Sequence, residues 1–230
     1  MNKKTVIYIL GCVLVFVSAF MLLPWFVSLI YSEETGKYFL YTAIAGFVIG
    51  RIMTWKKPEK GGFFAKEGFV SVALSWIVLS VVGAIPLWLS GEIPNFVDAL
   101  FEIVSGFTTT GASILNDVEA LPKGLLFWRA STHWLGGVGV VMFVLIVLPS
   151  MGSTKMRLSN VELSSMAKDN FRYQTKKILQ ILLVVYVGLT AAETLLLRIA
   201  GMGWFDAVCN SFSTIATGGF CTKNASIAAY

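Results

Sequence analysis

One stretch of this sequence occurs twice, and the repeat restricts the folds that the chain can adopt. Residues 98–111 (DALFEIVSGFTTTG) align without a gap on residues 206–219 (DAVCNSFSTIATGG), at an offset of 108 positions. Each copy ends in threonine and glycine and follows a long apolar segment. Because a repeat reflects architecture more directly than local patterns do, we expect two equivalent structural units.

The composition predicts that most of this chain lies in a membrane. Of its 230 residues 56% are hydrophobic and 13% are charged, whereas a soluble domain carries about 25% charged residues. Apolar runs at residues 5–31, 38–55, 68–90, 124–149 and 178–200 are each long enough to cross a hydrocarbon core. We read the first run as a retained span, because it is longer than the apolar region of a signal peptide and lacks an Ala-x-Ala cleavage site.

Two local features refine the first two spans. Pro24 predicts a kink in the first, because proline removes a helical hydrogen bond. Gly46 and Gly50 form a Gly-x-x-x-Gly pattern in the second, which predicts close packing of helix backbones.

The distribution of basic residues predicts the orientation. Most of the 18 Lys and Arg residues fall in the N-terminal segment and in the loops 56–66 and 150–177, which places that side in the cytoplasm. We therefore expect a multi-pass protein of the inner (plasma) membrane with a cytoplasmic N-terminus. The net charge of +5 reflects this orientation rather than nucleic-acid binding, which requires basic residues gathered on a soluble face.

Each repeat begins with a short helix. Asn95 and Gly203 can cap these helices, with Asp98 and Asp206 in their first turns. Each helix would end near the serine of the repeat, too early to cross, so the chain enters and returns. Two spans separate the copies, so both enter from the outer face, unlike the inverted repeats of many transporters.

The segments after the short helices are candidates for ion coordination. The C-terminal end of a helix stabilises a cation, and an extended segment can turn its carbonyl oxygens toward an ion where glycine permits the backbone angles. Neither segment contains an acidic residue, which favours a monovalent ion. Ordinary glycine–threonine turns at helix ends are the alternative interpretation. The predicted ion ligands are Thr109, Thr110, Gly111, Ala216, Thr217, Gly218 and Gly219, with Thr108 in support.

Ionisable residues inside spans need a partner or a role. We expect Glu102 to pair with Arg129 behind the ion-coordinating segment, and an exchange of the two charges to restore the activity lost in single variants. His133 lies four residues after Arg129 and is expected to act as a hydrogen-bonding strut. For Glu193 we favour a contact with Arg198 or with headgroups over a proton relay.

Three segments of the sequence resemble the Trk/Ktr/HKT superfamily of potassium transporters, and within it the TrkH-type bacterial potassium uptake subunit. They are SGFTTTG (105–111), FWRASTHWLGG (127–137) and FSTIATGGF (212–220). The resemblance implies four span–loop–span repeats around one pore, with the first two spans as an extra N-terminal helix pair. It also implies that Gly111 and Gly219 are filter glycines, and that glycine at 111 goes with potassium over sodium.

The predicted fold is an all-α polytopic membrane protein with span–pore-loop–span repeats. We divide it into an N-terminal two-helix extension (1–60), a first repeat (61–150), a cytoplasmic loop (151–177) and an incomplete second repeat (178–230). Either the sequence is the N-terminal half of a longer chain, which we favour, or two copies assemble. Predicted partners are a second copy, membrane lipid and, by resemblance, a cytosolic nucleotide-binding regulatory subunit, without nucleic acid.

The predicted function is potassium uptake by a pore-forming subunit, and a proton- or sodium-coupled cation symporter is the alternative. An enzyme is not expected, because the sequence has neither a His-Glu-x-x-His motif nor a Ser/His/Asp set of plausible geometry. Potassium is the expected bound ion, and no organic cofactor is expected.

Overall fold

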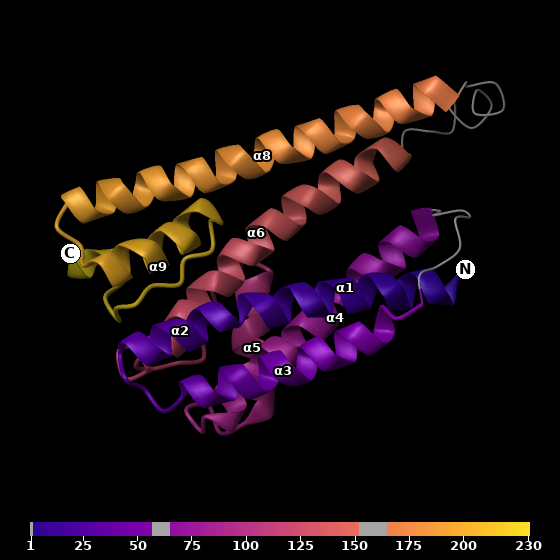
Figure 1. Ribbon diagram of the computed structural model, residues 1–230. Helices are drawn as coiled ribbons and strands as arrows, with labels where there is room; N and C mark the ends of the chain where they lie inside the picture. Colours follow the sequence, from indigo (N-terminus) through magenta and orange to yellow (C-terminus); the bar gives the residue numbers. More distant parts are fainter. Residues whose placement is uncertain (1, 57–64, 152–164) are drawn as a thin grey trace.

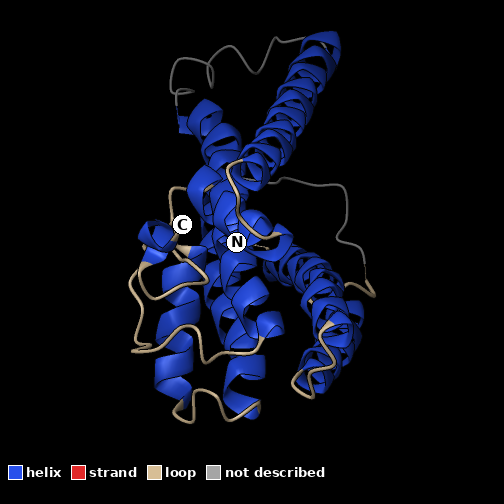
Figure 2. Cartoon of the chain, turned by 90° about the vertical axis from the view of Figure 1, so that its left-hand side faces the viewer, coloured by secondary structure: helices blue, strands red, loops and turns tan. Residues whose placement is uncertain are grey.

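The protein is helical throughout the part that its structure, a computed structural model, describes: residues 2–56, 65–151 and 165–230. No strand occurs among these residues (Figures 1 and 2). Most of the loop expected at 56–66 and residues 152–164 of the loop expected at 150–177 lie outside them. The all-helical prediction is confirmed.

The first apolar run forms two consecutive helices, α1 (Lys3–Phe20) and α2 (Leu22–Ile30). They are separated at Met21, three residues before Pro24, whose missing N–H leaves the carbonyl of Phe20 without its helical donor. The helix is thus interrupted near Pro24, where the kink was predicted.

Helix α3 (Gly36–Met53) returns antiparallel to α1 and packs against it at backbone distance. A Cβ atom on Gly50 would lie 2.9 Å from the carbonyl oxygen of Gly11, and one on Gly46 would overlap the hydroxyl of Ser18. The close packing expected from the Gly-x-x-x-Gly pattern is confirmed.

The first repeat consists of α4 (Ala65–Leu89), the short α5 (Phe96–Phe107) and α6 (Lys123–Met151). Its core contains buried aromatic rings, with Phe107 and Trp128 in edge contact at 6.3 Å between centroids. The Trp128 indole donates a hydrogen bond of 2.9 Å to the carbonyl of Gly83 in α4, so this buried ring leaves no unpaired N–H.

The second repeat contains α8 (Ser165–Ile199), α9 (Trp204–Ile215) and the short η1 (Ser226–Ala229). In Figure 1, α9 lies between α8 and α6. Helix α8 begins at Ser165, well before residue 178, where the fifth span was expected to begin, so residues 165–177 of the expected loop are helical and continuous with that span. No glycine or proline interrupts this stretch, and its Ala, Met, Lys, Arg and Gln residues are strong helix formers.

Three segments of the described chain are long and apolar enough to cross a membrane: Lys3–Ile30, Glu67–Leu89 and Lys177–Ile199. They correspond to the first, third and fifth expected spans. Helices α3 and α6 cover the other two expected spans but are not among these segments.

Candidate functional site

The two short helices match residue for residue at the offset of the sequence repeat. Helices α5 and α9 have 12 residues each, and both their first and their last residues are related by the same offset of 108. The side chain of Asn95 accepts a hydrogen bond of 3.0 Å from the N–H of Val97, as an N-cap does. Gly203 occupies the equivalent cap position.

Both helices end in the same hydrogen-bonded turn. The N–H of Thr109 donates to Gly106 at 3.0 Å and that of Thr110 to Ser105 at 2.9 Å. In the second copy Thr217 donates to Thr214 and Gly218 to Ser213, each at 2.8 Å. This pair of bonds defines the Schellman motif at a helix C-terminus.

The residue that turns the chain in this motif is a threonine in both copies. Thr109 has φ of 54° and Thr217 of 56°, in the left-handed region where glycine is usual and a β-branched residue is an outlier. Two positions later, Gly111 and Gly219 also have positive φ, 78° and 96°. The backbone is therefore repeated as well as the sequence, and strain lies at the same point in each copy.

Helices α5 and α9 run alongside α6 in the same direction. On α5, Glu102 contacts Arg129 and the end of the helix, Phe107, lies against Gly136. On α9, the ring of Phe205 lies 4.9 Å from the Lys123 ammonium.

The end of α9 lies beside Gly137, the residue of α6 that follows Gly136. A Cβ on Gly137 would lie 3.3 Å from the Cα of Ala216. Gly136 and Gly137 are about 20 Å from the start of α6, at about 1.5 Å of rise per residue. Both short helices thus start at one end of α6 and finish near its middle.

A buried ion pair ties the first loop to α6. The Glu102 carboxylate accepts from Arg129 Nη2 at 2.6 Å and Nε at 2.7 Å, and the two side chains are 0% and 2% exposed. The same carboxylate accepts from the Ser113 hydroxyl at 3.0 Å and the Ile114 N–H at 3.0 Å. One carboxylate therefore holds three pieces of chain: α5, the segment that returns from the loop, and α6.

The second repeat uses a different carboxylate at this point. Asn210 stands where the first repeat has Glu102. The returning segment is held instead by Asp206, one turn earlier, which accepts a hydrogen bond of 2.7 Å from the hydroxyl of Thr222. Thr222 is the equivalent of Ile114, so the position that is held is the same.

The second loop is fixed to α6 through Phe220, a residue that the site prediction omitted. The Arg129 guanidinium lies 4.2 Å from the centre of the Phe220 ring, and the His133 imidazole stacks on this ring with centroids 4.1 Å apart. The His133 Nδ1 and the Ser213 hydroxyl form a hydrogen bond of 2.8 Å. The hydrogen bond that we expected of His133 is present, and it reaches the second repeat.

The candidate ion-coordinating residues of the two loops lie against each other. A Cβ atom on Gly111 would overlap the carbonyl oxygen of Gly218, and one on Gly218 would overlap the imidazole of His133. A Cβ on Gly219 would meet nothing within 4 Å. Glycine is thus required by contact at 111 and 218, whereas at 219 only the backbone angle favours it.

The supporting residue Thr108 stabilises the end of α5. Its hydroxyl donates to the Val104 carbonyl at 2.8 Å and lies 2.7 Å from the hydroxyl of Thr110.

The segments that return from the two loops are joined at a polar junction. The Lys223 ammonium lies 2.8 Å from the Glu119 carboxylate, which also accepts from the Asn224 N–H at 3.2 Å. The Asn224 amide donates to Asp117 at 2.8 Å and accepts from the Val118 N–H at 2.7 Å. The hydrogen bond from Lys223 lowers the pKa of Glu119, and that from Asn224 lowers the pKa of Asp117.

The turn between the first two spans caps α6. The Glu33 carboxylate accepts from the N–H groups of Lys123 at 2.6 Å and Gly124 at 2.9 Å. These amides begin α6 and have no partner within their own helix. A negative charge also interacts favourably with a helix N-terminus, so the N-terminal helix pair stabilises the start of α6.

Of the two contacts that we favoured for Glu193, with Arg198 or with headgroups, the one with Arg198 is absent from the ion pairs of the described residues. Arg198 instead donates to the Met202 carbonyl at 3.2 Å and lies over the Trp204 ring, 5.6 Å from its centre. Within the same part of the chain, no three His, Cys, Asp or Glu side chains gather into a group that could hold a metal ion.

The sequence matches known TrkH proteins over most of its length. The family model described as TrkH, cation transport protein, matches residues 35–230. The chain is 41% identical to the Trk system potassium uptake protein TrkH of Salmonella typhimurium and 40% identical to that of Escherichia coli K12. Each alignment covers 99% of this chain and 48% of the relative.

A solved structure gives the same result. The crystal structure of the potassium transporter TrkH from Vibrio parahaemolyticus superposes with a TM-score of 0.86 at 32% identity, covering 100% of this chain and 46% of the other. The chain thus spans about half the length of the relatives that it matches. The extent of the family match shows that this chain belongs to the TrkH family of cation transport proteins.

Proposed function

We propose that this chain forms part of a potassium-conducting pore, in which the two loops supply carbonyl oxygens to the ion. The ligands would come from Thr109, Thr110 and Gly111 of the first loop and from residues 216–219 of the second. The observation that carries the proposal is the duplicated loop backbone: left-handed threonine and positive-φ glycine recur at equivalent positions, and the loops meet at Gly111 and Gly218. The names of the relatives describe potassium uptake.

The electrostatics of the short helices support the same conclusion. Helices α5 and α9 both finish near the middle of α6, and the C-terminal end of a helix carries a partial negative charge. Two such ends directed at one region stabilise a cation without an acidic side chain. Glu102 is buried in its ion pair with Arg129, so it serves as a brace and leaves ion contact to the backbone.

The two filter glycines offer a matched test. We expect Gly111→Ser to impair growth of a potassium-uptake-deficient bacterium on low potassium more than Gly219→Ser does, because only the first side chain would displace the neighbouring loop. Isotope flux would then measure potassium against sodium selectivity in both variants. Equal, wild-type growth and selectivity in the two variants would refute a filter at these positions.

Several finer points belong to this proposal. The protein lies in the inner membrane with its N-terminus in the cytoplasm, works as a homodimer, and meets a cytosolic nucleotide-binding subunit on its basic face. Coupling to protons or sodium is the alternative mechanism. Potassium flux that follows the membrane potential and ignores an imposed pH or sodium gradient would separate a channel from such a symporter.

A further inference from the structure

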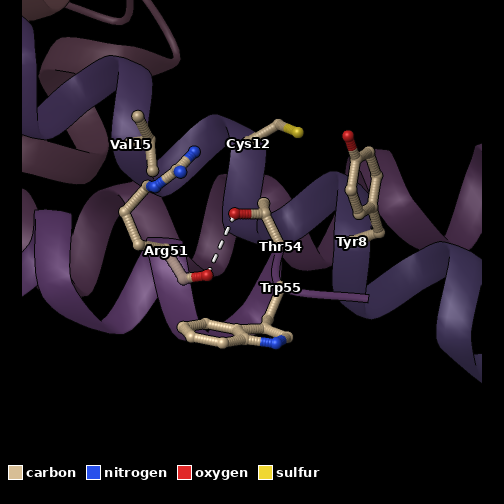
Figure 3. Close-up of a pocket in the computed structure, with 6 residues that line it drawn as sticks. All are labelled: Tyr8, Cys12, Val15, Arg51, Thr54 and Trp55. Carbon is tan, nitrogen blue, oxygen red and sulfur yellow. Dashed lines mark hydrogen bonds between the residues drawn. The ribbon is translucent and has the colours of Figure 1, made fainter. Parts of the chain in front are cut away.

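A cavity of about 580 Å³ lies between α1 and α3, and its lining includes no residue of the two repeated loops. Its lining residues are Tyr8, Cys12, Val15, Arg51, Thr54 and Trp55. Figure 3 shows Arg51 and Tyr8 on either side of Thr54, with the Trp55 indole along one wall. The cavity thus combines apolar walls with one cation, which is the composition of a site for an amphipathic anion.

The cavity lies toward the N-terminal end of the candidate membrane span Lys3–Ile30, beside which α3 runs, and the length of α3 agrees with a position near a membrane surface. Eighteen residues span about 27 Å, close to the roughly 30 Å of a hydrocarbon core. Lys37 and Arg51 lie near opposite ends of this helix, so they lie at opposite interfaces. Trp55 is 83% exposed just beyond Arg51, at the depth where tryptophan is enriched in membrane proteins.

Arg51 has a charge that the described part of the chain does not neutralise. Its side chain makes no ion pair or hydrogen bond with any described residue, although its backbone carbonyl accepts from the Thr54 hydroxyl at 3.2 Å. An arginine near the end of a membrane helix extends its side chain to the headgroup region, where a guanidinium can bind phosphate through two parallel hydrogen bonds. The exposed Lys3, Lys4 and Lys56 lie at the same end of the helix pair and add positive charge.

We propose that this cavity binds an anionic phospholipid. Arg51 holds the phosphate, the Tyr8 hydroxyl and the Trp55 indole lie at headgroup level, and an acyl chain follows Val15 toward the bilayer centre. The anionic lipid of the cytoplasmic leaflet is the occupant that the charge favours, because basic residues at this surface attract it. This proposal depends on the membrane position of α1 and α3 and is independent of potassium conduction.

Quenching of Trp55 by brominated lipid tests the site. The protein is reconstituted in phosphatidylcholine vesicles that contain a small fraction of phosphatidylglycerol with brominated acyl chains. The Trp55 signal is taken as the difference between the wild type and Trp55→Phe. We expect brominated phosphatidylglycerol to quench this signal more than the same fraction of brominated phosphatidylcholine does.

Arg51→Gln should weaken the relative affinity for phosphatidylglycerol about fivefold, the contribution of one basic residue near an anionic surface. Lys37→Gln is the matched control, because it removes an exposed charge at the opposite end of the same helix and should leave the quenching unchanged. Both side chains are exposed, so neither change should disturb the fold, and circular dichroism checks this.

Three results would overturn the proposal. Equal quenching by the two lipids would indicate unselective contact with bulk lipid, and unaltered quenching in Arg51→Gln would exclude the guanidinium as the phosphate ligand. Loss of the preferential quenching when millimolar inorganic phosphate is added would indicate a site for a free anion instead of a lipid.

Discussion

The imidazole of His133 and the phenyl ring of Phe220 stack with 4.1 Å between centroids and 20° between planes. This contact joins α6 to the residue directly after Gly219, so the position of the second loop depends on a side chain that follows the first loop in sequence. The same imidazole fills the space beside Gly218.

We expect His133→Ala to lower the free energy of unfolding by roughly 2–4 kcal/mol, because it leaves a cavity and breaks the hydrogen bond to Ser213. His133→Asn retains a hydrogen-bonding group and should lose less. Thermal unfolding in detergent measures stability, and isotope flux measures whether potassium selectivity falls in the same order. A wild-type melting temperature in His133→Ala would contradict the contact.

Glu102→Gln should destabilise the protein by roughly 3–5 kcal/mol, because it leaves the Arg129 charge buried without its partner. The double variant Glu102→Leu with Arg129→Met should lose much less than the sum of the single changes, since it removes both charges. Denaturant unfolding of the wild type, Glu102→Leu, Arg129→Met and the double variant gives the coupling energy. Additive losses would mean that the two side chains do not interact.

The contacts of Glu102 also revise the charge exchange that the sequence suggested. An arginine at position 102 can pair with a glutamate at 129, but it has no acceptor for the Ile114 N–H or the Ser113 hydroxyl. We therefore expect the exchanged variant to recover only part of the uptake.

Thr109→Gly should stabilise the protein by about 0.5–1 kcal/mol. A left-handed conformation costs an L-residue roughly 1–2 kcal/mol, and glycine avoids this cost. The larger backbone entropy that glycine loses on folding offsets only about 0.5–1 kcal/mol of the gain. Thr108→Gly is the control and should destabilise, because Thr108 has an ordinary φ of −79° and its hydroxyl is bonded to Val104.

If Thr109 is strained because ion coordination requires it, then Thr109→Gly should also lower potassium selectivity while it raises the melting temperature. A Thr109→Gly protein that is less stable than the wild type would contradict the backbone strain that we assign to Thr109.

The polar junction between the loops should depend on pH. The pKa of Glu119 lies below its ordinary 4.5, so its contribution to stability is present above that value and is lost as the pH falls through the lowered pKa. The pKa of Lys223 is raised above 10.5, so its contribution is present below that value and is lost as the pH rises through the raised pKa.

The difference in melting temperature between the wild type and Glu119→Gln measures this dependence. It should be constant from pH 4.5 to 10.5 and shrink outside that window. A difference that changes mainly near neutral pH would assign the effect to another group.

The sequence predicted the starts of the short helices well because their signals are local. Asn95 and Asp98 are a cap and a first-turn acid, and both act within one turn. The ends were placed two residues too early, near Ser105 and Ser213. The Schellman turn extends each helix to residues 107 and 215, and it uses a threonine where the usual signal is glycine.

The contacts that fix the loops in place could not be read from the sequence in the same way. Phe220, Glu33 and Glu119 act on partners about 90 or more positions away, and no helical or strand period relates such residues. Glu102 and Arg129 were an exception, because a buried charge demands a partner and the nearby sequence offered few.

The hydrogen bonds from α6 to Glu33 bear on any attempt to graft these loops onto another scaffold. A chimera that lacked the N-terminal helix pair would leave the N–H groups of Lys123 and Gly124 without their acceptor. These groups begin α6, the helix that both loops contact. The N-terminal helix pair is thus part of the structure that supports the loops. A chimera would have to include Glu33 or supply another carboxylate at the same place.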